Sequence, residues 1–152
     1  MIDISGKGAT RRMAVAMARV GLSDAALEAL RAGTLPKGPA LEVARLAGIM
    51  AAKKCSELIP FCHQVPLDHV QVEVKPGDGS VEIRATVRAK AATGVEMEAL
   101  TAVTVAALTI YDMCKALDPA AIITDVRVLR KSGGKHGDWS FEGHLPCPPR
   151  DA

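Results

Sequence analysis

Two groups of ionisable residues flank an uncharged stretch in the second half of the chain. Glu96 and Glu98 precede residues 99–111, which carry no charge, and Asp112 and Lys115 follow them. A carboxylate and an ammonium group three residues apart are neighbours on a helix surface and can exchange protons with a ligand. Charged groups at the ends of so apolar a helix are costly unless they are paired or solvated, which makes these residues candidates for chemistry.

The spacing of Glu98 and Asp112 limits how they can act together. On a straight helix the two lie on nearly the same face but ~21 Å apart, too far for one small substrate. If both are functional, the site combines helix ends from different subunits, and we interpret the uncharged middle as packing between chains. The alternative, which the residues leave open, is that Glu96 and Glu98 complement the helix N-terminus and that Asp112 and Lys115 form a surface pair.

A second candidate site is the glycine-rich segment 131–137, which follows Arg127 and Arg130. Glycines let the backbone approach a ligand closely, and exposed amides with lysines suit phosphate groups. The segment is not a Walker loop, and a flexible solvated hairpin is the alternative interpretation. His136 within it receives no role.

Prolines bracket the segment that contains Cys62 and His63. The spacing of nearby cysteines and histidines matches no usual zinc pattern, so no metal site is expected. We interpret Cys62 as a small packed residue and His63 as a polar group that a rigid loop presents. Lys53 follows an apolar helix face and points either to solvent or into a site.

Composition excludes several classes of protein. The chain has 152 residues, a net charge of +2 and only four aromatic residues, which is unlike a disordered tail or a nucleic-acid binder. The four cysteines show no paired spacing and no signal peptide is visible, so we expect a cytoplasmic protein. Residues 99–111 are too few to cross a bilayer, and no membrane anchor is expected.

Hydrophobic periodicity and turn residues predict the elements that position these side chains. Residues 11–20 suit a strand or a helix, and Ser23 and Gly33 are typical of the ends of a short helix. These elements together predict an antiparallel sheet with helices on one face, which is an α+β fold. We expect this domain to span residues 1–144, with a flexible tail at residues 145–152. The other predicted elements are helices at 40–58 and 93–115, strands at 67–75, 80–90 and 122–129, and a short strand at 139–141.

Together, these segments resemble the molybdenum cofactor biosynthesis protein C family, the cyclic pyranopterin monophosphate synthases. The likeness runs from the first residues to about Phe141, and its long-helix motif is very specific. The matching stretches are Ile2–Ser5 with Lys7, Thr10 and Arg12; Lys37-Gly38; Ala44–Ile49; Ala51–Lys53; Leu58–His63; Thr93–Ala102; Ala106–Lys115; and Lys131–Lys135.

The resemblance implies a ferredoxin-like fold and a homohexamer built as a trimer of dimers, with active sites between subunits. It also implies a lyase that rearranges 3′,8-cyclo-7,8-dihydroguanosine triphosphate to cyclic pyranopterin monophosphate and releases diphosphate. No tightly bound cofactor is expected, and Mg²⁺ accompanying the triphosphate is left open. The alternative is a non-catalytic nucleotide-binding or regulatory protein on the same fold.

The resemblance also implies residue roles by motif position. Asp112 is the expected general acid/base, and Lys115, one turn away, tunes it or shares the proton transfer. Many relatives carry a small aliphatic residue in place of Phe61, so the backbone there matters more than the ring. The remaining expected roles are substrate contact by Phe61, Cys62, His63, Met97 and Glu98, and phosphate binding or assistance to ring opening by Lys53, Lys37 and Lys131, the last also expected to be catalytic.

Overall fold

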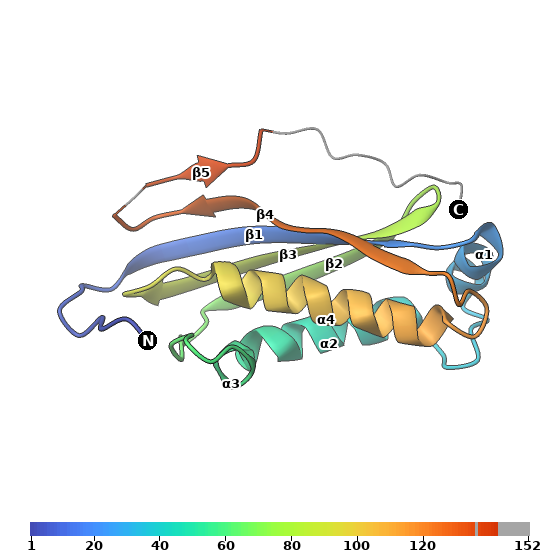
Figure 1. Ribbon diagram of the computed structural model, residues 1–152, viewed down its shortest axis with the longest axis horizontal. Coiled ribbons are helices and arrows are strands. Elements are labelled where there is room, and N and C mark those ends of the chain that lie inside the picture. The colour runs from blue at the N-terminus through green and yellow to red at the C-terminus, as the bar shows by residue number, and fades with distance from the viewer. Residues whose placement is uncertain (136, 143–152) are drawn as a thin grey trace.

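A computed structural model describes residues 1–135 and 137–142 as a five-stranded antiparallel sheet with its two long helices side by side on one face (Figure 1). The strand order is β2-β3-β1-β4-β5. The α+β class is confirmed; the finer ferredoxin-like description remains a prediction, with which the β-α-β-β-α-β succession of the main elements is consistent. The elements are β1 (Thr10–Gly21), α1 (Asp24–Ala32), α2 (Ala40–Lys53), α3 (Cys55–Leu58), β2 (His69–Pro76), β3 (Ser80–Ala91), α4 (Glu96–Cys114), β4 (Ile122–Ser132) and β5 (Trp139–Ser140).

The ambiguous segment 11–20 is the central strand β1. Its residues alternate between the two faces of the sheet, and Ala14, Ala16, Ala18 and Val20 are fully buried on the helix side. They lie opposite the buried apolar residues of β3. Because three of the four are alanines, the long helix α4 can lie close to the sheet.

Helices α2 and α4 pack through small residues. A Cβ atom at Gly48 of α2 would lie 2.9 Å from the carbonyl oxygen of Ala102 and 3.3 Å from the Cβ atom of Ala106, both in α4. The backbones therefore approach too closely to admit any side chain at Gly48. We call this contact the Gly48 seam.

One face of the uncharged middle of α4 is core within one chain, so the prediction that this stretch packs between chains and not as core within one is wrong for that face. Ala99, Val103, Ala106 and Ile110 are fully buried against the sheet and α2. By length and composition alone α4 could cross a membrane, but this burial is that of a core helix. The sequence pattern could not distinguish the two kinds of packing because both bury the same small apolar side chains.

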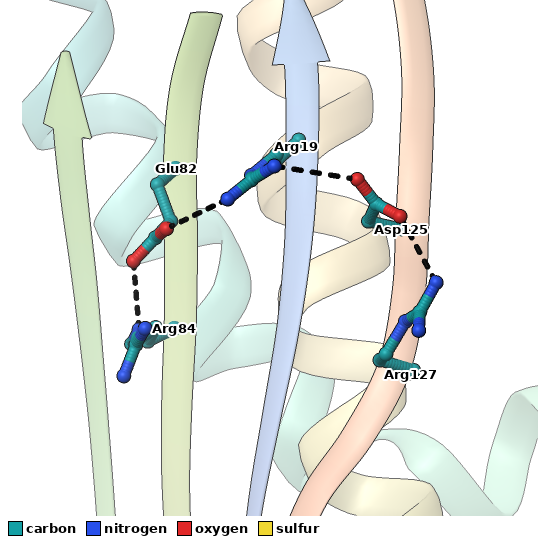
Figure 2. Close-up of polar contacts among 5 residues, drawn as sticks. All are labelled: Arg19, Glu82, Arg84, Asp125 and Arg127. Carbon is teal, nitrogen blue, oxygen red and sulfur yellow. Dashed lines mark hydrogen bonds and ion pairs between the residues drawn. The ribbon is translucent and has the colours of Figure 1, made fainter. Parts of the chain in front are cut away.

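The other face of the sheet carries a chain of ion pairs (Figure 2). Arg19 of β1 lies 3.7 Å from both Glu82 of β3 and Asp125 of β4. Glu82 also pairs with Arg84 at 2.7 Å, and Asp125 pairs with Arg127 at 3.0 Å. Asp125 sits in a β-bulge with φ +55°, a left-handed conformation that Asp tolerates better than most residues. This face is therefore bound together by charge, whereas the helix-covered face is apolar.

Two predicted boundaries are corrected. The helix predicted over 40–58 breaks at Lys54, so α3 forms a separate turn. The strand predicted over 122–129 continues to Ser132, so Lys131 lies in a strand and not in a flexible loop. The predicted tail, residues 145–152, lies outside the described residues, as does His136.

Candidate active site

A pocket at the start of α4 gathers the five residues predicted to contact substrate. We call it the Glu98 pocket. Figure 1 shows why these segments meet: the N-terminus, α3 and the first turn of α4 lie at one end of the molecule. The lining residues are Met1, Ile2, Ile4, Lys7, Phe61, Cys62, His63, Thr93, Gly94, Met97 and Glu98.

A tight turn after α3 places Cys62 and His63 in this pocket. The amide of Cys62 donates to the carbonyl oxygen of Ile59 at 3.0 Å, and Pro60 between them supplies no donor that would continue the helix. Phe61 is 76% exposed, so its ring makes little contact within this chain.

Glu98 is the buried acid of the pocket. It is 4% exposed, and its Oε2 atom has no hydrogen-bond partner among the described residues. Burial, and secondarily the nearby charge of Glu96, raises the pKa of this carboxyl above its ordinary value. A buried carboxyl with a free oxygen and a raised pKa can offer a ligand a proton or a hydrogen bond.

Replacing Glu98 with Gln should stabilise the protein as the pH rises. A raised folded-state pKa means that wild type loses stability as the pH climbs from the ordinary value of 4.5 through the folded pKa. Glutamine has no charge to bury, so the difference in Tm between Glu98→Gln and wild type should be absent at low pH and grow with pH. It should amount to about 2–4 °C for each kcal/mol by which the unfolding free energies differ. Thermal melts between pH 4 and 8 measure it, with exposed Glu28→Gln as the control for net charge; a Tm difference that shrinks with pH would contradict the assignment.

The thiol of Cys55 lies behind this pocket and stays protonated. Burial first, and then the charge of Glu98 and the neighbouring Cys62, raises the pKa of Cys55 to about 11. The hydroxyl of Thr101 donates a hydrogen bond to its sulfur atom at 3.4 Å. Cys55 is therefore a packing residue and not a nucleophile at neutral pH.

A second pocket adjoins the first and is lined by cations. We call it the Lys131 pocket; it shares Lys7, Thr93 and Gly94 with the Glu98 pocket, so the two lie side by side. Its charged residues are Lys7, Arg12, Lys131, Lys135 and Glu96. Oxygen-rich anions are the ligands that such a set of ammonium and guanidinium groups binds.

Strand register and two glycines explain the cationic lining. Lys131 pairs with Ala14, whose side chain lies on the helix side, and Lys131 likewise reaches Glu96 of α4 at 3.0 Å. Gly133 has φ +87°, and a Cβ atom there would collide with the carbonyl oxygen of Arg11. A Cβ atom at Gly134 would likewise collide with the guanidinium of Arg12.

Gly133→Ala should therefore lower the free energy of unfolding by about 2–3 kcal/mol and weaken diphosphate binding, because it adds a backbone collision to a left-handed conformation. Gly137→Ala is the matched control: Gly137 has φ +66° but no neighbour within 4 Å, so a loss of about 1 kcal/mol is expected. Urea unfolding measures the loss of unfolding free energy in both variants. Equal losses would show that the close approach to Arg11 has no energetic weight.

A third group of ionisable residues lies at the far end of α4. The ammonium groups of Lys37 and Lys115 lie 2.6 and 3.0 Å from the two carboxylate oxygens of Asp112. Hydrogen bonds from Lys37 first, and then from Lys115, hold the pKa of Asp112 below its ordinary value. We call these three residues the Asp112 cluster, an ionised carboxylate between two proton donors.

The predicted site residues thus fall into two separate places within one chain. Residues 61–63, Met97, Glu98 and Lys131 lie at one end of α4, and the Asp112 cluster lies ~21 Å away at the other. Lys53 ends α2 as an exposed residue and is not among the residues that line either pocket. In the described residues, no group of three or more His, Cys, Asp or Glu side chains is arranged to hold a metal ion.

Several lining residues were not predicted as site residues. The sequence could have placed Arg12 in the site, because it occupies one of the alternating positions of β1 whose side chains face the helices. Lys7 and Thr93 belong to stretches that resemble the family, but no local pattern assigns them to a site, since their place depends on the meeting of the N-terminal segment with the turn before α4. The charged lining residues that received no site role from the sequence are Lys7 and Arg12, whereas Glu96 and Lys135 lie in segments already named as candidates.

Comparisons with known proteins agree on one family. The sequence model of the MoaC family matches residues 1–134. The chain is 55% identical over 140 residues to cyclic pyranopterin monophosphate synthase 2 of Mycobacterium tuberculosis, which covers 92% of this chain and 84% of that protein. It is 55% identical over 140 residues to the cyclic pyranopterin monophosphate synthase of Streptomyces avermitilis, covering 92% and 82%. For the Chloroflexus aggregans enzyme of the same name, identity is 51% over 144 residues, covering 93% and 87%.

Proposed function

The chain belongs to the MoaC family, and we propose that it converts 3′,8-cyclo-7,8-dihydroguanosine 5′-triphosphate to cyclic pyranopterin monophosphate with release of diphosphate. It is then a lyase of molybdenum cofactor biosynthesis. The relatives named cyclic pyranopterin monophosphate synthase support this proposal through identity over nearly the whole chain.

The observation that carries the proposal is that the two pockets adjoin and share lining residues. The Glu98 pocket offers a buried carboxyl, His63 and apolar walls, which suit a polar ring system. The Lys131 pocket offers cations, which suit phosphates. A ligand with a purine-derived ring at one end and a triphosphate at the other matches this division.

The Asp112 cluster acts, in this proposal, on substrate that a neighbouring subunit holds. It lies ~21 Å along α4 from Glu98, beyond the reach of one small molecule. A two-fold interface brings the far end of α4 from one subunit to the pockets of its partner, and pairs of sites then repeat in a homohexamer, a trimer of dimers. The exposed side chains of the cluster, 47–54% accessible within one chain, are free to meet such a partner.

The chemistry requires proton transfers and a stabilised leaving group. The lowered pKa of Asp112 keeps it ionised, so it acts as the base and orients Lys37 and Lys115, which donate protons. Glu98 and His63 hydrogen-bond the ring. When a substrate hydroxyl attacks the α-phosphorus, the bond to diphosphate breaks and Lys7, Arg12 and Lys131 stabilise the departing negative charge.

No tightly bound cofactor is part of this proposal. Mg²⁺ would arrive coordinated by the triphosphate of the substrate, as a counter-ion. We also propose that the enzyme works in the cytoplasm, where its nucleotide-derived substrate is made.

Turnover of the cyclised nucleotide by the purified protein tests the function directly. We expect cyclic pyranopterin monophosphate and diphosphate to appear in equal amounts, followed by chromatography and a diphosphate assay. Binding of the nucleotide with no release of diphosphate would instead support a non-catalytic nucleotide-binding or regulatory protein.

A further inference from the structure

The Lys131 pocket contains an acidic side chain that the roles given above leave unused. Glu96 is the only carboxylate among the described residues that line it, and its Oε1 atom lies 3.0 Å from the ammonium nitrogen of Lys131. Both side chains are partly exposed, 29% and 39%, so a ligand can reach the pair. A fixed carboxylate repels phosphate, so its place in this pocket needs a physical account.

The carboxylate lies where the two pockets join. Gly94 lines both pockets, and a Cβ atom at Gly94 would collide with the carboxylate of Glu96. The side chain therefore folds back over the turn that precedes α4. A ligand extending from the Glu98 pocket into the Lys131 pocket passes this carboxylate.

Arg12 and Lys131 are held in different ways. The guanidinium of Arg12 donates hydrogen bonds to the carbonyl oxygens of Ala91 and Ala92 at 3.3 and 3.4 Å, and Gly134 packs against it. It is fixed by the backbone whether or not a ligand is bound. Lys131 is held at its tip by Glu96, a flexible side chain that can move away.

We infer that Glu96 competes internally with phosphate for Lys131. Its carboxylate holds the ammonium group in the free enzyme, gives way when the triphosphate enters, and returns as diphosphate leaves. The inference rests on the proposed function, and it makes Glu96 a positioning residue that acts through Lys131. Substrate is also held by its ring in the Glu98 pocket, whereas diphosphate is held by charge alone, so the competition favours product release.

Calorimetric titration with inorganic diphosphate tests this without turnover. Glu96→Gln should bind diphosphate about fivefold tighter than wild type, because one competing ion pair and its repulsion are removed. Steady-state kinetics should show a lower inhibition constant for diphosphate and a lower KM, with a reduced kcat from slow release. Glu28→Gln, an exposed carboxylate on α1, controls for net charge and should match wild type.

A second variant keeps the test decisive if Glu96→Gln does not fold. Gly94→Ala retains the carboxylate but displaces it from Lys131, so it should also tighten diphosphate binding. Unchanged or weaker binding in whichever of these variants is folded overturns the inference. If wild type forms product while diphosphate affinity does not change in the variants, only the inference fails; if affinity rises but wild type forms no product, the proposed function fails.

Discussion

Asp112→Asn is expected to lower kcat by about 10²–10⁴-fold, the usual effect of removing a positioned acid or base. Asparagine keeps the shape of the side chain but can no longer accept a proton or hold Lys37 and Lys115 by charge. The fold and the assembly should survive, because the pairs are exposed and such pairs contribute little to stability. Single-turnover formation of product measures the effect, with size-exclusion chromatography to verify assembly.

The pH dependence separates a chemical role from a structural one. Because the pKa of Asp112 is lowered, its small contribution to stability is fully present above the ordinary value of 3.8 and is lost only as the pH falls through the lowered folded value. Melts of wild type and Asp112→Asn should therefore coincide in shape from pH 5 upward. Asp24→Asn on α1 is the matched control and should retain wild-type kcat; a fully active Asp112→Asn enzyme would remove Asp112 from the mechanism.

Mixed assemblies of two inactive variants should recover about a quarter of wild-type activity. If each site takes His63 from one subunit and Asp112 from its partner, random reassortment of His63→Ala and Asp112→Asn makes half of the pairs mixed, and each mixed pair has one intact site of two. Co-expression with two different tags, followed by purification and turnover assays, measures the recovery.

The control for this experiment pairs two variants from the same pocket. His63→Ala and Glu98→Gln change residues of one pocket in one chain, so no mixture of these subunits contains an intact site with both side chains. The mixture should therefore not exceed the activity of its components. Absence of recovery with Asp112→Asn, despite demonstrated mixed assemblies, would mean that each site is built within one subunit.

Much of the fold could be predicted because burial imposes a period on the sequence. Strict alternation in residues 80–90 predicted β3, and the apolar run after Glu98 predicted α4. Gly33 ends α1 with φ +68°, as a C-terminal glycine should. The break at Lys54 was missed because Cys55 continues the buried face of α2, and hydrophobic periodicity does not register a single interrupted turn.

The site was predictable only in part, for a different physical reason. Residues 61–63 and 97–98 were grouped by resemblance, and the structure places them in one pocket. The pairing of Lys37 with Asp112 and that of Glu96 with Lys131 join residues 75 and 35 positions apart. Such contacts depend on how elements cross in space, and neither composition nor local spacing contains that information.

The Gly48 seam has a consequence for how this enzyme can vary. Lys37 precedes α2 and Cys55 follows it, while Asp112 and Glu98 stand at the matching ends of α4, so one helix pair serves both reactive places. Sliding α2 along α4 by a single residue, ~1.5 Å, would displace Lys37 from Asp112 at one end and Cys55 from Glu98 at the other. A substitution at the seam therefore cannot be compensated at one end alone: the pockets at one end of the helix pair and the Asp112 cluster at the other share one alignment and must evolve together.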